Sequence, residues 1–527
     1  MESLTEELVR IPSVVDTPGE QTCARYIFDL LARQPYFQAN PDHLVLLPTR
    51  DDDHSRSAVI ALVRGRSAPK TGAPAYLLMG HLDTVDTADY GPLRHLACDP
   101  PALAAATEAP PEYMVGRGAL DMKSGVAANL AVLLAFAAGD GPQAGSLVLA
   151  ACPDEEGASH GILSVVEALP GLAERWGLSL QGAINTDFIA PRFPGDEERP
   201  IYIGTIGKLL PSLFVAGLET HAGDPFRGFD PNWLVAEVVR RVDYNTDLCD
   251  RAFGEVTPPP VSLKSTDLKA FYSVQTPQYG WAYFNWFTMQ ATCDTVLAQF
   301  RTVVADAFSD LLQAFGEKAS AYGTMARLPV PQAPRNPTVY TYSELAQVVR
   351  ERKGPGFEAE VAARLLADQP GIDPRVFCCR LTEALWEASG LPAPAAVVGF
   401  AHVYSPPVHT APTDPLAVAA AAAARSVSAE MGYEIPLQHY FPFISDMSFV
   451  DCPEPPEGLA MLRQNNPGTG HVFRVHHEAH ARLGLPVINI GPWGEGAHTR
   501  RERVERRWSF AVVPELVWRT LEQVLAQ

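Results

Sequence analysis

Five short stretches of the chain combine histidines or carboxylates with small and turn-forming residues, and their composition indicates metal chemistry. They are 80–85 (GHLDTV), 118–125 (GALDMKSG), 153–157 (PDEEG), 185–187 (NTD) and 496–499 (GAHT). Imidazole nitrogens and carboxylate oxygens are the donors that bind zinc and related cations. A single histidine would be weak evidence, because histidine has many structural roles. The ordered set together predicts a centre for a pair of divalent cations.

Asp121 is the carboxylate at the middle of this prediction. It lies in the decamer GRGALDMKSG (116–125), where an expected helix from Met122 to Ala138 begins. The flanking glycines would permit the rigid backbone and close approach that a carboxylate shared by two metals requires. Aspartate is also a common helix N-cap. The decamer alone leaves both interpretations open.

The expected secondary structure places the candidate residues at the ends of strands. Apolar, β-branched runs predict strands, and small-residue or amphipathic segments between them predict helices. The strands are expected at 57–63, 75–79, 146–152 and 182–186, and the helices at 122–138 and 161–169. This alternation is typical of an α/β fold with a mostly parallel central sheet. In such sheets ligands bind at the carboxyl ends of strands, where His81, Asp83, Glu155, Glu156 and Asp187 all lie.

The length of 527 residues predicts about two to four domains. The pattern of residue types changes near Gly204. We expect residues 204–407 to form an inserted α+β domain of the lid or dimerisation type with extra helices. The catalytic domain would then consist of residues 1–203 and 408–527. A proline-punctuated linker is expected at 328–337.

Composition limits the classes of partner. With 47% hydrophobic and 19% charged residues, the chain is typical of a globular protein, and 41 basic against 61 acidic residues give a net charge of -20. This balance argues against nucleic acid and against an anionic membrane. We expect no apolar run long enough to span a bilayer and no signal peptide, hence a cytoplasmic location. The eight cysteines form no C-x-x-C pair, so neither a thiolate zinc site nor a disulfide framework is indicated.

The five motifs resemble the M20 family of zinc-dependent metallopeptidases and deacylases, over about residues 1–227 and 395–510. The long RocB-type members are the most similar subgroup. The resemblance implies two zinc ions, although Co²⁺ or Mn²⁺ would also suit a carboxylate-rich site. It makes Glu155 the general base and Asp83 the group that orients His81. The implied metal ligands are His81 and Asp187 for one ion, Glu156 and His498 for the other, and Asp121 as the bridge.

A further motif, 220–223 (THAG), resembles the family within the inserted domain. In relatives the matching histidine reaches an active site, often that of the partner subunit, and stabilises the developing oxyanion. The resemblance therefore implies a catalytic role for His221 and makes a homodimer an expected assembly. A histidine held in a surface turn is the alternative, since glycines surround it. Arg227 and Asn232 are candidate substrate contacts.

The sequence also departs from the family pattern. The strand AYFNWFTM (282–289) carries Asn285 where many relatives have an arginine that grips a substrate carboxylate. Its aromatic residues are expected to pack on both faces of a strand. The segment 301–394 exceeds a usual lid, and it would cap the site, replace a dimer contact or decorate the fold. We expect Asp446 to act as a helix cap, with shaping of the site as the alternative.

These observations predict a hydrolase that cleaves an amide bond in a small substrate, of the peptide or N-acyl amino acid type, through a water activated by two zinc ions. The alternative is a catalytically inactive ligand-binding protein that keeps the fold. The intact Glu155 favours the enzyme, because a binding protein needs no proton shuttle. No G-x-S-x-G sequence supports a serine hydrolase.

Overall fold

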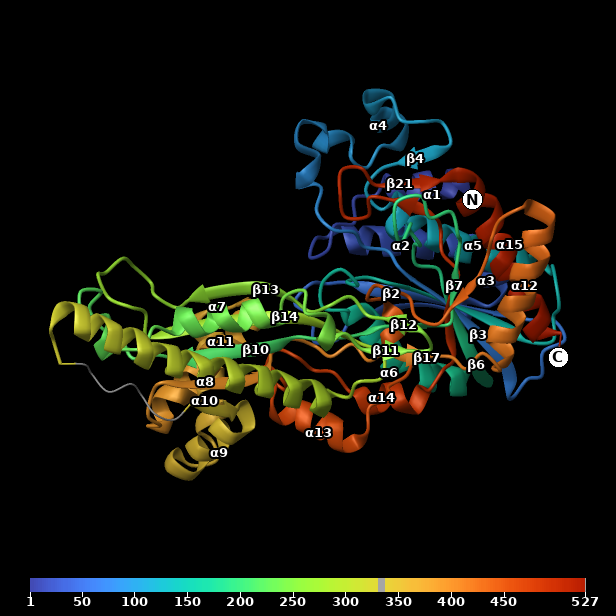
Figure 1. Ribbon diagram of the computed structural model, residues 1–527. Helices are drawn as coiled ribbons and strands as arrows, with labels where there is room; N and C mark the ends of the chain where they lie inside the picture. Colours follow the sequence, from blue (N-terminus) through green and yellow to red (C-terminus); the bar gives the residue numbers. More distant parts are fainter. Residues whose placement is uncertain (330–336, 527) are drawn as a thin grey trace. The chain divides into compact units, whose positions relative to one another are not determined.

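The computed structural model describes residues 1–329 and 337–526. The chain divides into two compact units (Figure 1). The first contains Met1–Ile206, Pro407–Pro453 and the chain from His476 onward, and the second contains Gly207–Pro406 and Glu454–Val475. The predicted linker at 328–337 lies largely outside the described residues.

The segment Glu454–Val475 differs from the expected boundaries, which assigned it to the second part of the catalytic domain. Its contacts explain its place in the second unit. The Cys293 N–H donates to Glu454 Oε1 (3.0 Å), and the Phe400 N–H donates to the Asn465 carbonyl oxygen (2.8 Å). Helix α13 (Pro456–Gln464) packs against α8 (Cys293–Ala326).

The first unit is built on an eight-stranded sheet of order β1-β2-β5-β3-β6-β19-β7-β18. Neighbours β5, β3, β6 and β19 run parallel, whereas β1 and β2 form an antiparallel edge and β7 runs antiparallel to β19. The centre of the sheet is therefore parallel, as predicted, and the α/β class is confirmed. The strands are β1 (Leu44–Pro48), β2 (Ser57–Arg64), β3 (Ala73–His81), β5 (Ser146–Cys152), β6 (Leu178–Asn185), β7 (Ile201–Tyr202), β18 (Leu437–Gln438) and β19 (Val487–Asn489).

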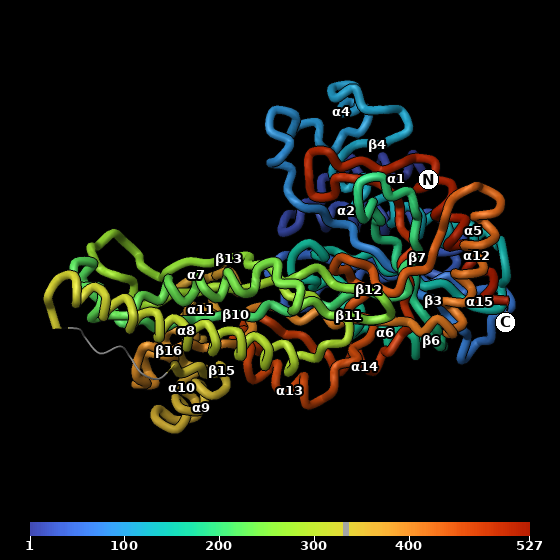
Figure 2. Tube along the Cα trace, in the orientation of Figure 1, coloured from blue at the N-terminus to red at the C-terminus, as the bar shows by residue number. Residues whose placement is uncertain are grey.

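Helices cover both faces of this sheet. The crossover from β3 to β5 contains α5 (Ser124–Ala138), and the crossover from β5 to β6 contains α6 (His160–Arg175). Because these two crossovers lead in opposite directions along the sheet and such connections are right-handed, the two helices lie on opposite faces (Figures 1 and 2). The other main helices are α2 (Gly19–Ala32), α12 (Pro415–Met431) and α15 (Val513–Leu525).

Helix α5 corrects one expectation. The segment Ala119–Ala138 is long and apolar enough, by composition, to cross a membrane, whereas the sequence had suggested no such run. In the structure 83% of this segment's apolar window is buried. Small residues allow α5 to pack against β3 and β5 on one side and α15 on the other. The segment is a core helix, and the predicted cytoplasmic location stays a prediction.

The second unit contains a sheet of order β13-β14-β10-β16-β15, with β9 (Gly207–Leu209) paired to β14. One face packs on helices α9, α10 and α11 through a core that includes Phe214, Trp281 and Trp386. The extra segment 301–394 therefore supplies core side chains to its own unit. The strands are β10 (Pro211–Ala216), β13 (Val261–Asp267), β14 (Tyr279–Thr288), β15 (Thr338–Thr341) and β16 (Ala395–Phe400), and the helices are α7 (Pro231–Val242), α8, α9 (Tyr342–Lys353), α10 (Phe357–Asp368) and α11 (Pro374–Ser389).

The buried imidazole of His480, on α14 (His477–Leu483), predicts acid sensitivity of the first unit. Among the described residues neither ring nitrogen has a hydrogen-bond partner, and burial lowers the pKa of His480 to about 3. In the unfolded chain the pKa of this histidine is near 6.5, so the unfolded chain binds a proton there at a higher pH than the folded protein does. The free energy of unfolding therefore decreases from about pH 6.5 downward. We expect the wild type to lose about 2 kcal/mol more than His480→Leu between pH 7 and pH 5, measured by urea unfolding.

The matched control is His95→Leu, which replaces an exposed histidine of the same unit. It should keep the acid sensitivity of the wild type. Equal pH dependence of the wild type and His480→Leu would contradict the prediction.

Candidate metal centre

The parallel pairing of β5, β3 and β6 brings three of the motifs together. Strand β3 ends at His81, β5 ends at Cys152 just before the Asp154–Glu156 turn, and β6 ends two residues before Asp187. Since β3 pairs in parallel with both of its neighbours, the three carboxyl ends meet at one edge of the sheet. Residues that are more than a hundred positions apart in sequence thus become neighbours.

Asp121 lies between two histidines, with one carboxylate oxygen toward each. His81 Nε2 is 3.0 Å from Asp121 Oδ1, and His498 Nε2 is 3.0 Å from Asp121 Oδ2. His498 Nε2 also lies 2.8 Å from Glu156 Oε1. Potential ligand atoms of His81, Asp121 and Glu156 all fall within 4.8 Å of one another. The two oxygens of Asp121 therefore face different donor groups, as a shared ligand requires.

Asp121 does not cap α5, because Lys123 takes the N-cap position, and the N-cap interpretation is wrong. The φ and ψ angles of Asp121 are -112° and 99°, the peptide bond to Met122 is cis, and α5 begins only at Ser124. Close packing explains the glycine at the start of α5: a Cβ atom on Gly125 would lie 2.0 Å from the Thr186 carbonyl oxygen. Gly118 has a φ of +80°, which favours glycine.

A buried ion pair beneath Asp121 was not indicated by the sequence. Glu502 Oε1 accepts hydrogen bonds from the N–H groups of Leu120 (3.1 Å) and Asp121 (3.3 Å). Glu502 Oε2 accepts from Arg117 Nη1 (2.7 Å), and both side chains of this pair are 1% exposed. Glu502, itself paired with Arg117, therefore fixes the backbone of the 116–121 loop through these hydrogen bonds. The only signal in the sequence was an arginine between two glycines.

Asp83 has a second role besides the one that the resemblance implied. Its carboxylate accepts hydrogen bonds from the backbone N–H groups of Glu155 (3.1 Å) and Glu156 (3.0 Å). His81 Nδ1 lies 3.2 Å from the Asp83 carbonyl oxygen and 3.6 Å from its Oδ1. Asp83 thus contacts the histidine ring and also fixes the turn that carries both glutamates.

The site concentrates negative charge with little compensation. Burial raises the pKa of Glu155 and of Asp187 well above the ordinary range, and it also raises the pKa of Glu156. Hydrogen bonds to Asp121, and then to Glu156, raise the pKa of His498 to about 11. Within residues 1–329 and 337–526, no lysine or arginine forms an ion pair with Asp121, Glu155, Glu156 or Asp187. Four carboxylates and two imidazoles without a basic partner form a donor set that fits divalent cations.

Asp187 is buried at the same strand edge but outside the group of three that could share one ion. Its N–H donates to Asn489 Oδ1 (2.9 Å), and Asn489 Nδ2 donates to the Asp187 carbonyl oxygen (2.9 Å). In the paired strands β6 and β19, Asn489 is the register partner of Asn185, two residues before Asp187. The assignment of Asp187 as a metal ligand stays a prediction.

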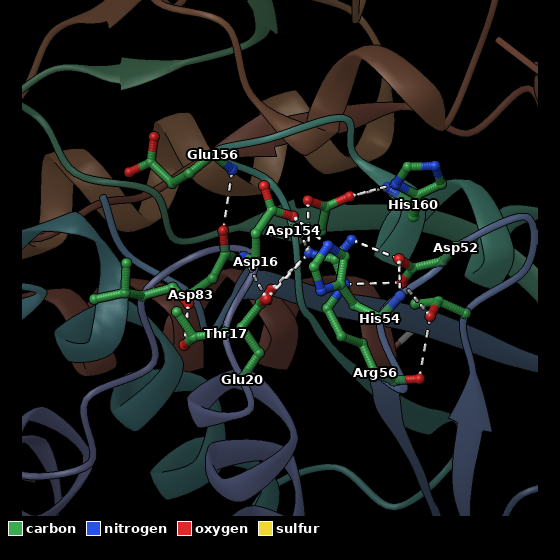
Figure 3. A network of polar contacts seen from close by, with 12 residues as sticks. Asp16, Thr17, Glu20, Asp52, His54, Arg56, Asp83, Asp154, Glu156 and His160 are labelled. Carbon is green, nitrogen blue, oxygen red and sulfur yellow. Dashed lines mark hydrogen bonds and ion pairs between the residues drawn. The ribbon is translucent and has the colours of Figure 1, made fainter. Parts of the chain in front are cut away.

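A second polar network holds the turn that precedes Glu155 (Figure 3). Arg56 Nη1 donates to Asp154 Oδ1 (2.9 Å) and Glu20 Oε2 (3.0 Å), and Arg56 also pairs with Asp52 through Nε (2.8 Å) and Nη2 (2.8 Å). Asp154 Oδ2 accepts from the His160 N–H (2.9 Å). Burial raises the pKa of Glu20 to about 8. One buried guanidinium therefore connects helix α2, strand β2 and the glutamate turn.

Two further candidates take different positions. Asp446 was expected to cap a helix, but Ser445 makes the cap of the short helix Asp446–Phe449, where its side chain accepts from the Met447 N–H. Among the described residues, neither carboxylate oxygen of Asp446 has a hydrogen-bond partner. His221 lies in the second unit on an exposed turn, and its Nδ1 accepts from the Gly223 N–H (3.0 Å). The catalytic role of His221 stays a prediction, and Arg227 pairs with Asp224 (2.8 Å).

The fold and this carboxylate–histidine cluster define a metallohydrolase of the α/β class. The chain matches the sequence profile of Peptidase family M20/M25/M40 over residues 77–491. The chain therefore belongs to this family, as the resemblance had indicated, and it is a hydrolase of the kind that cleaves amide bonds.

Similarity to individual proteins supports a RocB-like subgroup. YqjN from Bacillus subtilis (strain 168) is 31% identical over 100% of this chain and 96% of its own length. Protein RocB from the same organism is 30% identical over 100% of this chain and 95% of its own length. Among solved structures, the M20 family metallo-carboxypeptidase Sso-CP2 from Sulfolobus solfataricus is similar, with a TM-score of 0.55 and 12% identity over 100% of this chain and 99% of that one. This likeness shows the fold.

The Arg56 network yields a prediction about stability. Removing the guanidinium would leave the buried carboxyl groups of Glu20 and Asp52 without their cationic partner, so Arg56→Leu should lower the free energy of unfolding by about 3 to 5 kcal/mol in denaturant titrations. Arg50→Leu is the control, because the side chain of this neighbouring arginine is 72% exposed and, among the described residues, forms an ion pair only with Glu167. The control should cost under about 1 kcal/mol. Similar losses for the two variants would contradict the prediction.

Proposed function

We propose that the protein hydrolyses an amide bond in a small substrate, of the peptide or N-acyl amino acid type, at a centre of two zinc ions. The observation that supports this proposal best is the position of Asp121 between His81 and His498, in a cluster of buried carboxylates that no arginine or lysine of the described residues neutralises. Such a cluster is stable only with cations or with protons, since buried like charges repel strongly.

The proposed ligands are those that the resemblance to the family implies, and the close approach of His81, Asp121 and Glu156 supports three of them. His81 and Asp187 would hold one ion, Glu156 and His498 the other, and Asp121 would bind both. When bound, two such ions lower the pKa of a shared water toward about 7 and polarise a carbonyl oxygen. Zinc suits this mixture of nitrogen and oxygen donors, and Co²⁺ or Mn²⁺ would also be accommodated.

Glu155 is proposed as the general base. Among the described residues none donates a hydrogen bond to its carboxylate, so both oxygens are free to accept a proton. Its backbone N–H, like that of Glu156, is held by Asp83, and this fixed turn lets the two neighbouring side chains take separate tasks. Glu155 would take a proton from the attacking water and return it to the leaving amine.

The relatives suggest substrates of modest size. Succinyl-diaminopimelate desuccinylase from Methylobacterium nodulans (strain LMG 21967 / CNCM I-2342 / ORS 2060) is 32% identical over 44% of this chain and 52% of its own length. Its name supports an N-acyl substrate here as much as the family name supports a peptide. A role for His221 in stabilising the oxyanion, and a homodimer that would supply it, are part of the proposal. The alternative is an inactive ligand-binding protein.

Replacement of the general base separates these alternatives. Glu155→Gln keeps the shape of the side chain but cannot accept the proton, so kcat should fall by about 10² to 10⁴ with the metal content unchanged. The measurements are metal analysis and turnover of a panel of N-acyl amino acids and dipeptides. Glu174→Gln, an exposed change on α6, is the control and should keep full turnover. Undiminished turnover in Glu155→Gln would exclude Glu155 as the base.

Metal binding itself gives an independent prediction. The wild type should lose turnover on dialysis against a chelator and regain it with Zn²⁺. Asp121→Asn keeps the size of the side chain but removes its charge, so it should bind fewer ions per chain after zinc loading. An equal metal content in Asp121→Asn and the wild type would count against a bridging carboxylate.

A further inference from the structure

A large pocket in the first unit adjoins the loop that carries His498 and has no assigned role. Its volume is about 930 Å³, which is within the range of small-molecule sites. One wall comes from the segment between Tyr90 and Val115, and the other comes from residues 495–503. Gly496 and Thr499, on either side of His498, line the pocket directly.

The first wall of this pocket, from the segment between Tyr90 and Val115, is apolar. Leu93, Leu103, Ala109 and Val115 line it, and they belong to a hydrophobic cluster that also includes Tyr90. The short elements that carry these residues are the helix Ala88–Leu96, α4 (Pro100–Thr107) and β4 (Tyr113–Val115). An apolar wall of this size favours a ligand with a hydrocarbon or aromatic body.

The opposite wall carries positive charge without compensation. Arg503 pairs with Glu495 (2.7 Å), and Glu502 pairs with Arg117 (2.7 Å), so these charges are neutralised in place. In the part of the chain that the structure describes, neither the Arg500 nor the Arg501 guanidinium forms an ion pair. Two arginines without ion pairs, opposite an apolar wall, are suited to a ligand that has an apolar body and a terminal carboxylate.

We propose that this pocket binds a small carboxylate with an apolar body, whose head group pairs with Arg500 and Arg501. The site is distinct from the metal ligands, although a bound ligand would contact the residues next to His498. The proposal goes beyond the hydrolytic function and does not depend on it, because binding is measured without turnover.

The test uses 4-phenylbutyrate and the neutral 4-phenylbutan-1-ol in calorimetric titrations of the zinc-loaded protein. The two probes share a body and differ in the head group, so the carboxylate should bind about tenfold more tightly or better. The double variant Arg500→Gln/Arg501→Gln should lose this advantage and leave the alcohol unaffected. Arg425→Gln, an exposed arginine on α12, is the control and should bind both probes as the wild type does.

A second variant tests the apolar wall. Ala109 is partly exposed, so Ala109→Glu should leave folding intact, as checked by circular dichroism, and should weaken both probes by placing a charge in the pocket. Binding of 4-phenylbutyrate should also survive removal of the metal. Unchanged affinity in the double arginine variant, or binding that disappears with the metal, would overturn the proposal, since the probe would then bind at the ions.

Discussion

The crowding of buried carboxylates at one edge of the first sheet is the constraint on which the rest of this unit depends. Like charges at such short range are tolerated only if the backbone that carries them is held against their repulsion. That restraint comes from outside the cluster. Asp83 accepts hydrogen bonds from the N–H groups of the glutamate turn, and Glu502 accepts them from the Asp121 loop. Arg56 donates a hydrogen bond to Asp154 and thereby connects it to α2. The supporting side chains are themselves buried and charged.

Two of the supporting carboxylates are balanced in a way that the cluster is not, whereas Asp83 has His81 of the cluster itself as its partner. Glu502 has Arg117, and Asp154 has both Arg56 and His160. Among the residues that the structure describes, the cluster around Asp121 has ion-pair contacts with histidines only. Ligand sites and structural salt-bridge networks both contain groups with shifted pKa values, so a pKa shift alone does not separate them. The difference in charge balance between the supports and the centre is the feature that does.

Much of this arrangement could be predicted from the sequence. The strands that end at His81 and before Glu155 read as apolar runs, and parallel pairing then required their ends to meet. The supporting contacts were harder to predict from the sequence, since Glu502 and Asp121 are 381 residues apart and no local pattern indicates their contact. Asp446 was misread because Ser445, one residue earlier, takes the cap. The segment 454–475 was misplaced because side-chain contacts such as that of Glu454 with Cys293, and not its composition, decide which unit it joins.

The interrupted order of the first unit has a consequence for biosynthesis. Strand β6 gains its neighbour β19 only when Asn489, 302 residues after Asp187, has been made. At about 5 to 20 residues per second, the ribosome needs about 15 to 60 seconds to cover that interval. During this time His81, Asp121 and Glu156 exist without His498, and the Asp121 loop lacks Glu502. A nascent chain therefore carries an incomplete set of the proposed ligands, and the complete proposed set forms only when the C-terminal segment has docked.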